Sequence, residues 1–408
     1  MNPFKFHFCK FVLLVILIIP STNSFSQFTS FDYELSSTKV ASSLVDAYGL
    51  LWVATEEGLN LYDGKRVHSF ESVLADEKSL LNSNVNTIRE LDNSDLLFIS
   101  KDGISIFQRE TYDFKRVKIP SPVSLVVDKQ SNEIFITTSL KGIYILDFEY
   151  NIKNHFLTDP LNPFSISTNS FNKSSAQRTA KVLNDAGDII FGTEKGLNVY
   201  LAKRKNFQRF ISNSRGSSKS QINVISKLTN NMVLIGYNNG INLFDFKSKK
   251  LTEFNLDEIF SNQTIFDILT FDLSEEILSE EDLSSNSNPY LSYILTDSGL
   301  YSTSINIDFK INNVTKIFDN KNTSLNKISL SNKGFIVWGN DKKEVLSFEK
   351  SGSLISKDFS NYGISNLCVN KNQEIFISTV NGLLSSKKNP EFLKYKGMFD
   401  GLENYTNS

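Results

Sequence analysis

The chain has 408 residues, of which 40% are hydrophobic, and it carries 43 basic and 45 acidic residues for a net charge of −2. That length can bury one large core or two ordinary ones, as expected of a globular protein. Charge of both signs spread along the chain gives no electrostatic reason to bind nucleic acid or an acidic membrane.

The first predicted element is a secretory signal peptide at residues 1–26. Two lysines precede an apolar run at residues 11–19, and Pro20 and small residues follow. Cleavage before Gln27 would place the mature protein in the periplasm, with no membrane insertion of its own. The alternative is a membrane anchor, which is disfavoured because the run is shorter than the roughly 20 residues of a span.

The cysteine count excludes an intrachain disulfide in the mature protein. Cys9 lies within the predicted leader, so cleavage leaves Cys368 alone. Cys9 also precedes the apolar run, and it therefore cannot be the lipid-bearing cysteine of a lipoprotein.

After the leader, one short pattern recurs along the chain. It is most complete in "LWVATEEGLNLYDGKRVHSF" at residues 51–70, where a hydroxyl residue is followed by a turn and a glycine. A degenerate copy at Gly334–Phe348 fills the one double step, so eight repeats run from Val40 to Tyr395, about 46 residues apart. The turn glycines are Gly58, Gly103, Gly142, Gly196, Gly240, Gly299 and Gly382.

Each repeat divides into four short apolar runs bounded by turn residues, with no helical period between them. Strands are predicted in the first copy at Val40–Val45, Leu51–Thr55, Leu59–Tyr62 and Arg66–Phe70. Four antiparallel strands repeated at this period predict an all-β fold, a β-propeller of seven blades plus an extra repeat or of eight blades.

The local chemistry of the turns follows from that fold. We expect Gly58, Gly196 and Gly240 to have positive φ, since a tight hairpin turn needs such a residue. The hydroxyl before each turn, Thr55 in the first copy, is expected to bond the turn backbone.

The repeat count leaves two domain organisations open. In the first, residues 27–362 form a seven-bladed propeller and residues 363–408 begin a second one, so that Phe399–Ser408 starts an inner strand and the chain is the front of a longer receptor. In the second, residues 363–408 supply a closing blade, Phe31–Leu35 completes its sheet as the outer strand, and the last ten residues are a tail.

The passage at residues 51–70 resembles the two-component regulator propeller repeat, with its tryptophan, Thr-x-x-Gly turn, Gly-Leu-Asn and Tyr-Asp-Gly. The other copies match less closely, because Trp52 is replaced by aliphatic residues. In this family such repeats form the periplasmic sensor region of hybrid two-component systems in Gram-negative bacteria. They commonly build two seven-bladed propellers ahead of an immunoglobulin-like domain, a membrane span and a histidine kinase. By analogy, the resemblance favours seven blades plus the start of a second ring.

The resemblance implies sensing of an extracytoplasmic ligand, often an oligosaccharide, by a receptor able to form a homodimer. This sequence contains no second apolar span and no phosphoacceptor context, so no signalling output is assigned to it.

No catalytic constellation, cofactor site or metal site is predicted. The sequence has no Gly-x-Ser-x-Gly elbow and no His or Cys cluster with metal spacing. His68 and His155 are expected to pack or lie at the surface. The stretch Asn184–Asp188 is interpreted as a turn rather than a calcium loop, and the acidic Ser274–Pro289 as a solvated insertion.

A ligand surface is predicted on one face of the ring, since the turns between second and third strands emerge on the same face as the links between blades. Polar groups there could hydrogen-bond a polyhydroxylated ligand. The loop Leu157–Gln177 would overhang that face as a lid. The candidate ligand residues are Glu57, Lys101, Asp102, Lys141, Glu194, Lys195, Asn239 and Asp297.

Two classes of function stay open. The first is a signal-receiving propeller. The second is a secreted propeller that acts as a protein-interaction scaffold or, less plausibly, as a hydrolase or lyase with carboxylates that meet across blades.

Overall fold

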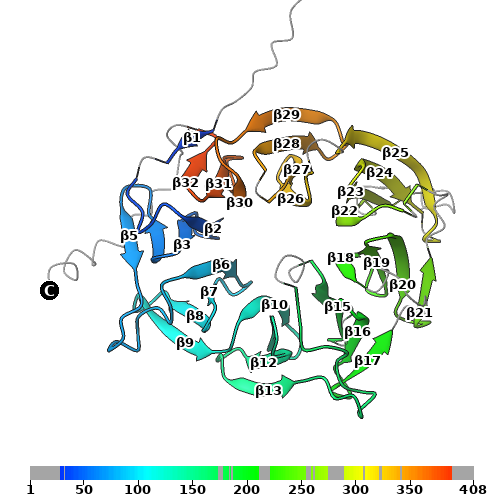
Figure 1. The fold of residues 1–408 in the computed structure, drawn as a ribbon, viewed down its shortest axis with the longest axis horizontal. Helices are drawn as coiled ribbons and strands as arrows, with labels where there is room; N and C mark the ends of the chain where they lie inside the picture. The colour runs from blue at the N-terminus through cyan, green and yellow to red at the C-terminus, as the bar shows by residue number, and fades with distance from the viewer. Residues whose placement is uncertain are drawn as a thin grey trace, which may run out of the picture.

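A computed structural model describes residues 28–387, apart from 32, 173–177, 183, 185–186, 211–220, 254–258, 261, 274–288, 307, 321–323 and 341. In this part of the chain, eight four-stranded antiparallel sheets form a ring (Figure 1). The all-β propeller prediction is confirmed, and of the two blade counts the structure has eight. The predicted signal peptide, the acidic insertion apart from Pro289, and Phe399–Ser408 lie outside the described residues.

The first four blades follow one another in chain order, each built from the inner strand outward. Blade 1 contains β2 (Val40–Val45), β3 (Leu51–Thr55), β4 (Leu59–Tyr62) and β5 (Val67–Phe70). Blade 2 contains β6 (Val85–Glu90), β7 (Leu96–Ser100), β8 (Gly103–Gln108) and β9 (Asp113–Lys118). Blade 3 contains β10 (Pro122–Asp128), β11 (Glu133–Thr138), β12 (Ile143–Asp147) and β13 (Ile152–Phe156). Blade 4 contains β14 (Ala180–Val182), β15 (Ile189–Thr193), β16 (Gly196–Leu201) and β17 (Asn206–Phe210).

The other four blades complete the ring. Blade 5 contains β18 (Ile222–Lys227), β19 (Met232–Tyr237), β20 (Gly240–Asp245) and β21 (Lys250–Glu253). Blade 6 contains β22 (Ile265–Asp272), β23 (Tyr290–Thr296), β24 (Gly299–Ile305) and β25 (Ile311–Asp319). Blade 7 contains β26 (Lys327–Ser331), β27 (Gly334–Trp338), β28 (Glu344–Glu349) and β29 (Leu354–Phe359). Blade 8 contains β30 (Ile364–Val369), β31 (Ile375–Thr379), β32 (Gly382–Ser385) and β1 (Thr29–Ser30).

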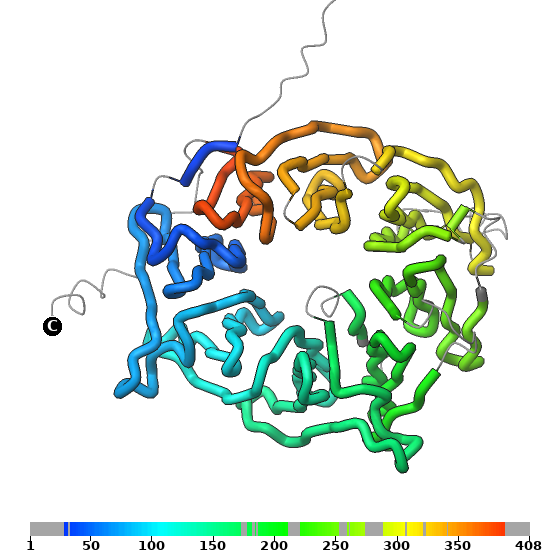
Figure 2. The backbone as a smooth tube through the Cα atoms, viewed as in Figure 1, coloured from blue at the N-terminus to red at the C-terminus, as the bar shows by residue number. Residues whose placement is uncertain are grey.

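Blade 8 is closed by the N-terminal segment, which lies beside the end of the last repeat (Figure 2). Thr29 pairs with Ser385, and the amide of Phe31 donates to the carbonyl of Leu383 at 2.9 Å. Phe31 is 9% exposed and stacks its edge on Tyr62 of blade 1. The closing strand is therefore Thr29–Ser30, slightly earlier than the expected Phe31–Leu35. This short strand covers the edge of β32 that would otherwise be unpaired.

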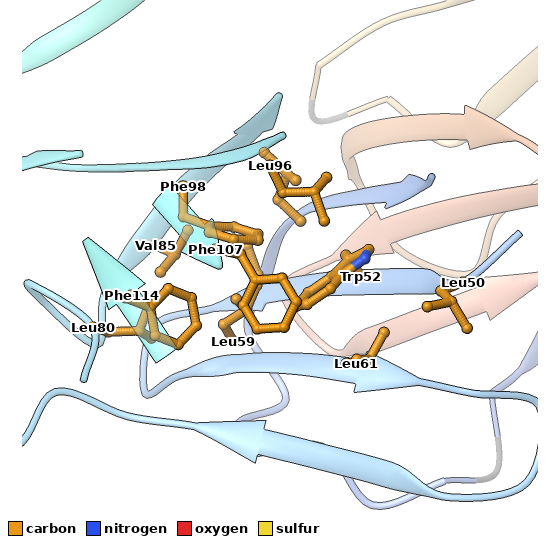
Figure 3. Close-up of a cluster of buried hydrophobic side chains, with 12 residues drawn as sticks. Leu50, Trp52, Leu59, Leu61, Leu80, Val85, Leu96, Phe98, Phe107 and Phe114 are labelled. Carbon is orange, nitrogen blue, oxygen red and sulfur yellow. The ribbon is translucent and has the colours of Figure 1, made fainter. Parts of the chain in front are cut away.

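The apolar core lies between blades rather than within them. Eight clusters of buried side chains occupy the eight successive blade interfaces. In the cluster between blades 1 and 2, the ring of Trp52 packs on Phe98 and Phe107 (Figure 3). A single blade exposes two apolar faces, so the repeats are stable only when stacked on neighbours.

The predicted hydroxyl contact holds the turns. Thr55 Oγ1 donates to the carbonyl of Gly58 at 2.8 Å, and the same bond recurs in blades 2, 3, 4, 6 and 8. Gly196 and Gly240 have φ of 100° and 116°, as expected. The expectation is wrong for Gly58, whose φ lies outside the left-handed region. A Cβ on Gly58 would lie 2.9 Å from the carbonyl oxygen of Phe70, so close approach of the outer strand selects this glycine.

Candidate functional site

The face that carries the hairpin turns between second and third strands is called the turn face below. The links between blades do meet these turns, because the amide of Ser121 donates to the carbonyl of Lys101 at 2.7 Å and that of Ile119 donates to the carbonyl of Asp102 at 3.2 Å. The turn face therefore contains both the hairpin turns and the links between blades, as the propeller topology predicts.

The eight predicted ligand residues all lie in these turns. Most are exposed, and Asn239 is half-buried. They come from six blades, so the ring spreads them around the whole face, and only Lys101 with Asp102 and Glu194 with Lys195 share a turn. Their role in binding stays a prediction.

The turn face of blade 2 contains a groove of about 720 Å³. It brings the predicted pair Lys101 and Asp102 together with residues that sequence reasoning did not select. The full lining is Ser72, Val73, Leu74, Glu77, Leu81, Lys101, Asp102, Arg116, Lys118, Ile119, Pro120 and Ser121.

One wall of this groove is the link at residues 71–84, which joins blade 1 to blade 2 and is held by Arg116 of β9. Arg116 Nε donates to the carbonyl of Ser79 at 2.7 Å, and Nη2 donates to the carbonyl of Leu80 at 2.8 Å and to the hydroxyl of Ser79. A charged donor that satisfies several backbone carbonyls fixes the wall at a defined distance from the turn.

The groove combines polar groups with exposed apolar surface. Asp102 Oδ2 accepts from Asn82 Nδ2 at 2.6 Å, which orients the carboxylate at the edge of the groove. Leu74 is fully exposed and Val73 is half exposed, although both are apolar. Charged groups beside an apolar shelf can bind a ligand that offers hydroxyl groups on its edges and C–H groups on its faces.

The predicted lid, the loop Leu157–Gln177, is anchored over blade 4 in the same way as the link at residues 71–84 is anchored over blade 2. Its described part, residues 157–172, contacts the turn of blade 3, because the amide of Gly142 donates to the carbonyl of Asn169 at 2.9 Å. Arg209 of β17 holds this loop as Arg116 holds the first link, with Nε 2.7 Å from the carbonyl oxygen of Ser165. Glu194 lines a cavity of about 100 Å³ here, which is too small for a sugar.

A second group of charged residues meets across the central channel, and we call Arg89, Arg178, Lys181, Asp267 and Lys327 the channel cluster. Arg178, just before β14 in blade 4, places Nη1 3.5 Å from Asp267 Oδ2 in blade 6. The same Nη1 donates to the carbonyl of Asn326, just before β26 in blade 7, at 2.9 Å. Blade 4 is a neighbour of neither blade 6 nor blade 7, so these contacts run across the centre of the ring, which the inner strands surround (Figure 1).

Burial perturbs the ionisation of the channel cluster. Burial and then the charge of Arg178 lower the pKa of Lys327 to about 8, and burial alone lowers the pKa of Arg89 to about 10. Burial also lowers the pKa of Lys181. Desolvation raises the pKa of Asp267, against the opposing effect of Arg178 and the amide of Ile328.

Sequence reasoning missed the channel cluster and the first link. The link could have been found from its length, since 14 residues join blades 1 and 2 where three join blades 2 and 3. Arg89 and Lys181 had a signal too, because they occupy the inner-strand position that is Leu44 in blade 1. Arg178 and Lys327 do not occupy this repeated position, so the comparison of repeats does not point to them.

The remaining polar residues singled out in the sequence have local partners. His68 Nε2 lies 3.0 Å from Asp63 Oδ2, and His155 stacks on Tyr144 with ring centroids 3.9 Å apart. Asn184 and Asp188 hydrogen-bond within a turn between β14 and β15. In the described part of the chain, no group of three or more His, Cys, Asp or Glu residues could hold a metal ion. Nor does that part contain a helix long and apolar enough to cross a membrane.

Comparison with known proteins identifies the fold. No protein-family profile matches the chain, and no curated protein matches it. BamB from Moraxella catarrhalis is similar over 88% of this chain and 98% of its own, with 12% identity and a TM-score of 0.55. That likeness shows a shared propeller fold.

Other solved structures align more loosely. Two extracellular domains from B. thetaiotaomicron, described as parts of a one component system and a hybrid two component system, align with 89% and 88% of this chain. Their identities are 16% and 17%, and their TM-scores are 0.49 and 0.42. The chain spans 40% and 53% of the length of these domains. A streptogramin B lyase aligns with 88% of this chain and 96% of its own, at 11% identity and a TM-score of 0.47.

Proposed function

We propose that this chain is an extracytoplasmic ligand-sensing propeller that takes an oligosaccharide or a similar polar ligand at the turn face of blade 2. The groove between Lys101, Asp102 and the link at residues 71–84 carries this proposal. Its volume of about 720 Å³ is in the range of small-ligand sites, and its lining mixes charged groups with an apolar shelf. The sensing role itself rests on the resemblance of the repeat at residues 51–70.

The wider receptor is part of the same proposal. The predicted signal peptide would export the chain, and the resemblance implies that the propeller is the sensor part of a hybrid two-component receptor. Sequencing the gene beyond the codon for Ser408 tests this context. A reading frame that continues to a membrane span and a histidine kinase supports it, whereas a secreted monomer with a stop codon there favours the scaffold function.

Calorimetric titration with a panel of neutral and acidic oligosaccharides tests the ligand site. We expect one probe to bind with 1:1 stoichiometry, and we expect the double variant Lys101→Ala, Asp102→Ala to weaken that binding at least tenfold without loss of the fold. If no oligosaccharide binds but a secreted protein does, through the exposed Leu74, the ligand class is wrong and the scaffold function is supported.

A matched pair of arginine variants locates the site. Arg116→Met releases the link at residues 71–84, and Arg209→Met releases the equivalent loop over blade 4. Both lose the same kind of anchor, so their costs in stability should be similar. Only Arg116→Met should abolish ligand binding; a larger loss of affinity in Arg209→Met would move the site to the predicted lid.

A further inference from the structure

The channel cluster has an unbalanced charge. It contains four basic side chains from blades 2, 4 and 7 and one carboxylate, Asp267. Asp267 is already engaged by Arg178 and by the backbone amide of Ile328 at 3.0 Å. Among the described members of the channel cluster, one carboxylate is thus set against four cations.

Three of these cations have no carboxylate of their own. Within the described residues, Arg89, Lys181 and Lys327 form no ion pair with an acidic side chain. The guanidinium of Arg89 donates to the carbonyl of Ile88, and the ammonium of Lys327 lies over the ring of Trp338, 4.5 Å from its centroid. Both contacts suit a cation, but neither neutralises its charge.

The positions of these charges are costly without a counterion. Lys327 of blade 7 is close enough to Arg178 and Arg89 for both charges to oppose its protonation. Like charges repel more strongly where side chains exclude water, since the effective dielectric constant falls. On the turn face the same residue types are solvated and mixed in sign, so the imbalance is particular to the channel.

We propose that the central channel binds a small multivalent oxyanion, a molecule carrying a carboxylate, sulfate or phosphate group with at least two acceptor oxygens. Guanidinium groups bind such groups through paired N–H donors, and ammonium groups bind them as point charges. Arg178 is held toward the middle of the ring by Asp267 and by the carbonyl of Asn326. Lys181 and Lys327 supply charge from blades 4 and 7. An anion bound among these side chains supplies the negative charge that Asp267 alone does not.

This site is separate from the turn-face groove and does not depend on its ligand. The groove lies at the outer part of blade 2, where Arg116 and Lys118 of β9 line it, whereas the channel cluster extends from the inner strands. The double variant Lys101→Ala, Asp102→Ala should therefore keep full anion binding, which separates failure of this proposal from failure of the sensing function.

Isothermal titration in a buffer of low ionic strength tests the site, with sodium phosphate, sodium sulfate and sodium citrate as probes and sodium chloride at matched ionic strength as the reference. We expect at least one probe to bind with 1:1 stoichiometry and chloride to produce no such isotherm. The preferred probe distinguishes a phosphate, sulfate or carboxylate ligand. If none of the three binds, or if chloride binds equally well, the proposal is wrong.

Two lysine variants and one control assign the binding to the channel. Lys181→Met and Lys327→Met each remove a charge with little change in volume, and each should raise the Kd of the probe at least tenfold. Lys203→Met, in an exposed turn between β16 and β17, should leave the Kd unchanged. Wild-type affinity in the double variant Lys181→Met, Lys327→Met would place the anion elsewhere.

A stability measurement distinguishes a binding site from a structural cluster. In the absence of multivalent anions, Lys327→Met should unfold at a higher temperature than the wild type, because it removes one of several like charges. At the same concentration, the probe anion should then raise the midpoint of the wild type by more than that of the variant. A lower midpoint for the variant in anion-free buffer would mean that Lys327 supports the fold, and would contradict the proposal.

Discussion

The turn face and the central channel carry the same kinds of side chain in opposite circumstances. On the turn face, Lys101 stands next to Asp102 and Glu194 next to Lys195, all exposed to solvent. In the channel, Asp267 is 7% exposed and faces four cations. Because solvent screens the first set more than the second, single charges should matter less to stability on the turn face than in the channel.

The difference has a topological cause. Each turn is a local hairpin, and its side chains point into water whatever the neighbouring blade contains. Inner strands instead converge from all blades, so Arg178 of blade 4 meets residues of blades 6 and 7. A charge that is harmless in one repeat becomes coupled to charges from distant repeats once the ring closes.

The largest expected effect comes from the single channel carboxylate. Asp267→Asn keeps the shape of the side chain but removes the carboxylate that pairs with the guanidinium of Arg178. Breaking one side of a buried ion pair costs about 3 kcal/mol of unfolding free energy. Urea denaturation measures this directly.

The matched control is Asp297→Asn on the turn face, where the carboxylate is exposed and accepts from the amide of Thr264 at 3.3 Å. That change should stay within about 0.5 kcal/mol. Equal costs for the two variants would remove the distinction between the two regions.

Backbone geometry gives the next effect, and it belongs to the turn face. Gly196 has φ of 100°, where a β-branched residue is strained, so Gly196→Val should cost about 1 to 3 kcal/mol in urea denaturation. Val380→Thr, in the equivalent turn of blade 8, needs no left-handed backbone and serves as the control. An unchanged midpoint for Gly196→Val would show that turn geometry does not limit stability there.

The sequence predicts the parts of this molecule that repeat. The first three strands of blade 1 have the predicted bounds, and the fourth begins at Val67, one residue later than predicted. The predicted Thr55 hydroxyl bond is also present. The close approach that selects Gly58 was missed, because it depends on where the outer strand lies rather than on the turn. Closure by Thr29–Ser30 pairs residues more than 350 positions apart, so no local pattern specifies it.

The candidate sites likewise divide into residues that a repeated local pattern predicts and residues that only non-local contacts bring together. Lys101 and Asp102 were found because every repeat has a turn there. Arg116 was missed because its partners, the carbonyls of Ser79 and Leu80, belong to the preceding link. The channel cluster combines unequal positions from non-adjacent blades, and only the ring brings them together.

The channel should also respond to pH. The pKa of Lys327 is about 8 in the folded protein, below its ordinary value of 10.5, so the unfolded chain binds the proton more tightly. Stability contributed by this group should therefore rise as the pH increases from about 8 to 10.5. Arg178, Arg89 and Asp267 are the charged groups that act on it.

Cys368 and Tyr237 have raised pKa values and contribute the opposite slope above pH 9, so the comparison must be made between variants. The stability advantage of Lys327→Met over the wild type should shrink by about 2 kcal/mol between pH 7 and pH 9.5. A constant difference across that range would mean that Lys327 titrates normally.

The smallest effect is expected where the ligand residues were predicted. Replacing Lys101, Asp102, Glu194 and Lys195 together with alanine removes two charges of each sign, so the net charge does not change. These side chains are exposed, and their loss should change the unfolding free energy by no more than about 0.5 kcal/mol per site. Binding of an oligosaccharide should nevertheless fall, because Lys101 and Asp102 line the proposed ligand groove. A variant that unfolds well below the wild type would show that the turn ring supports the blades, and its loss of binding could then no longer be attributed to the groove.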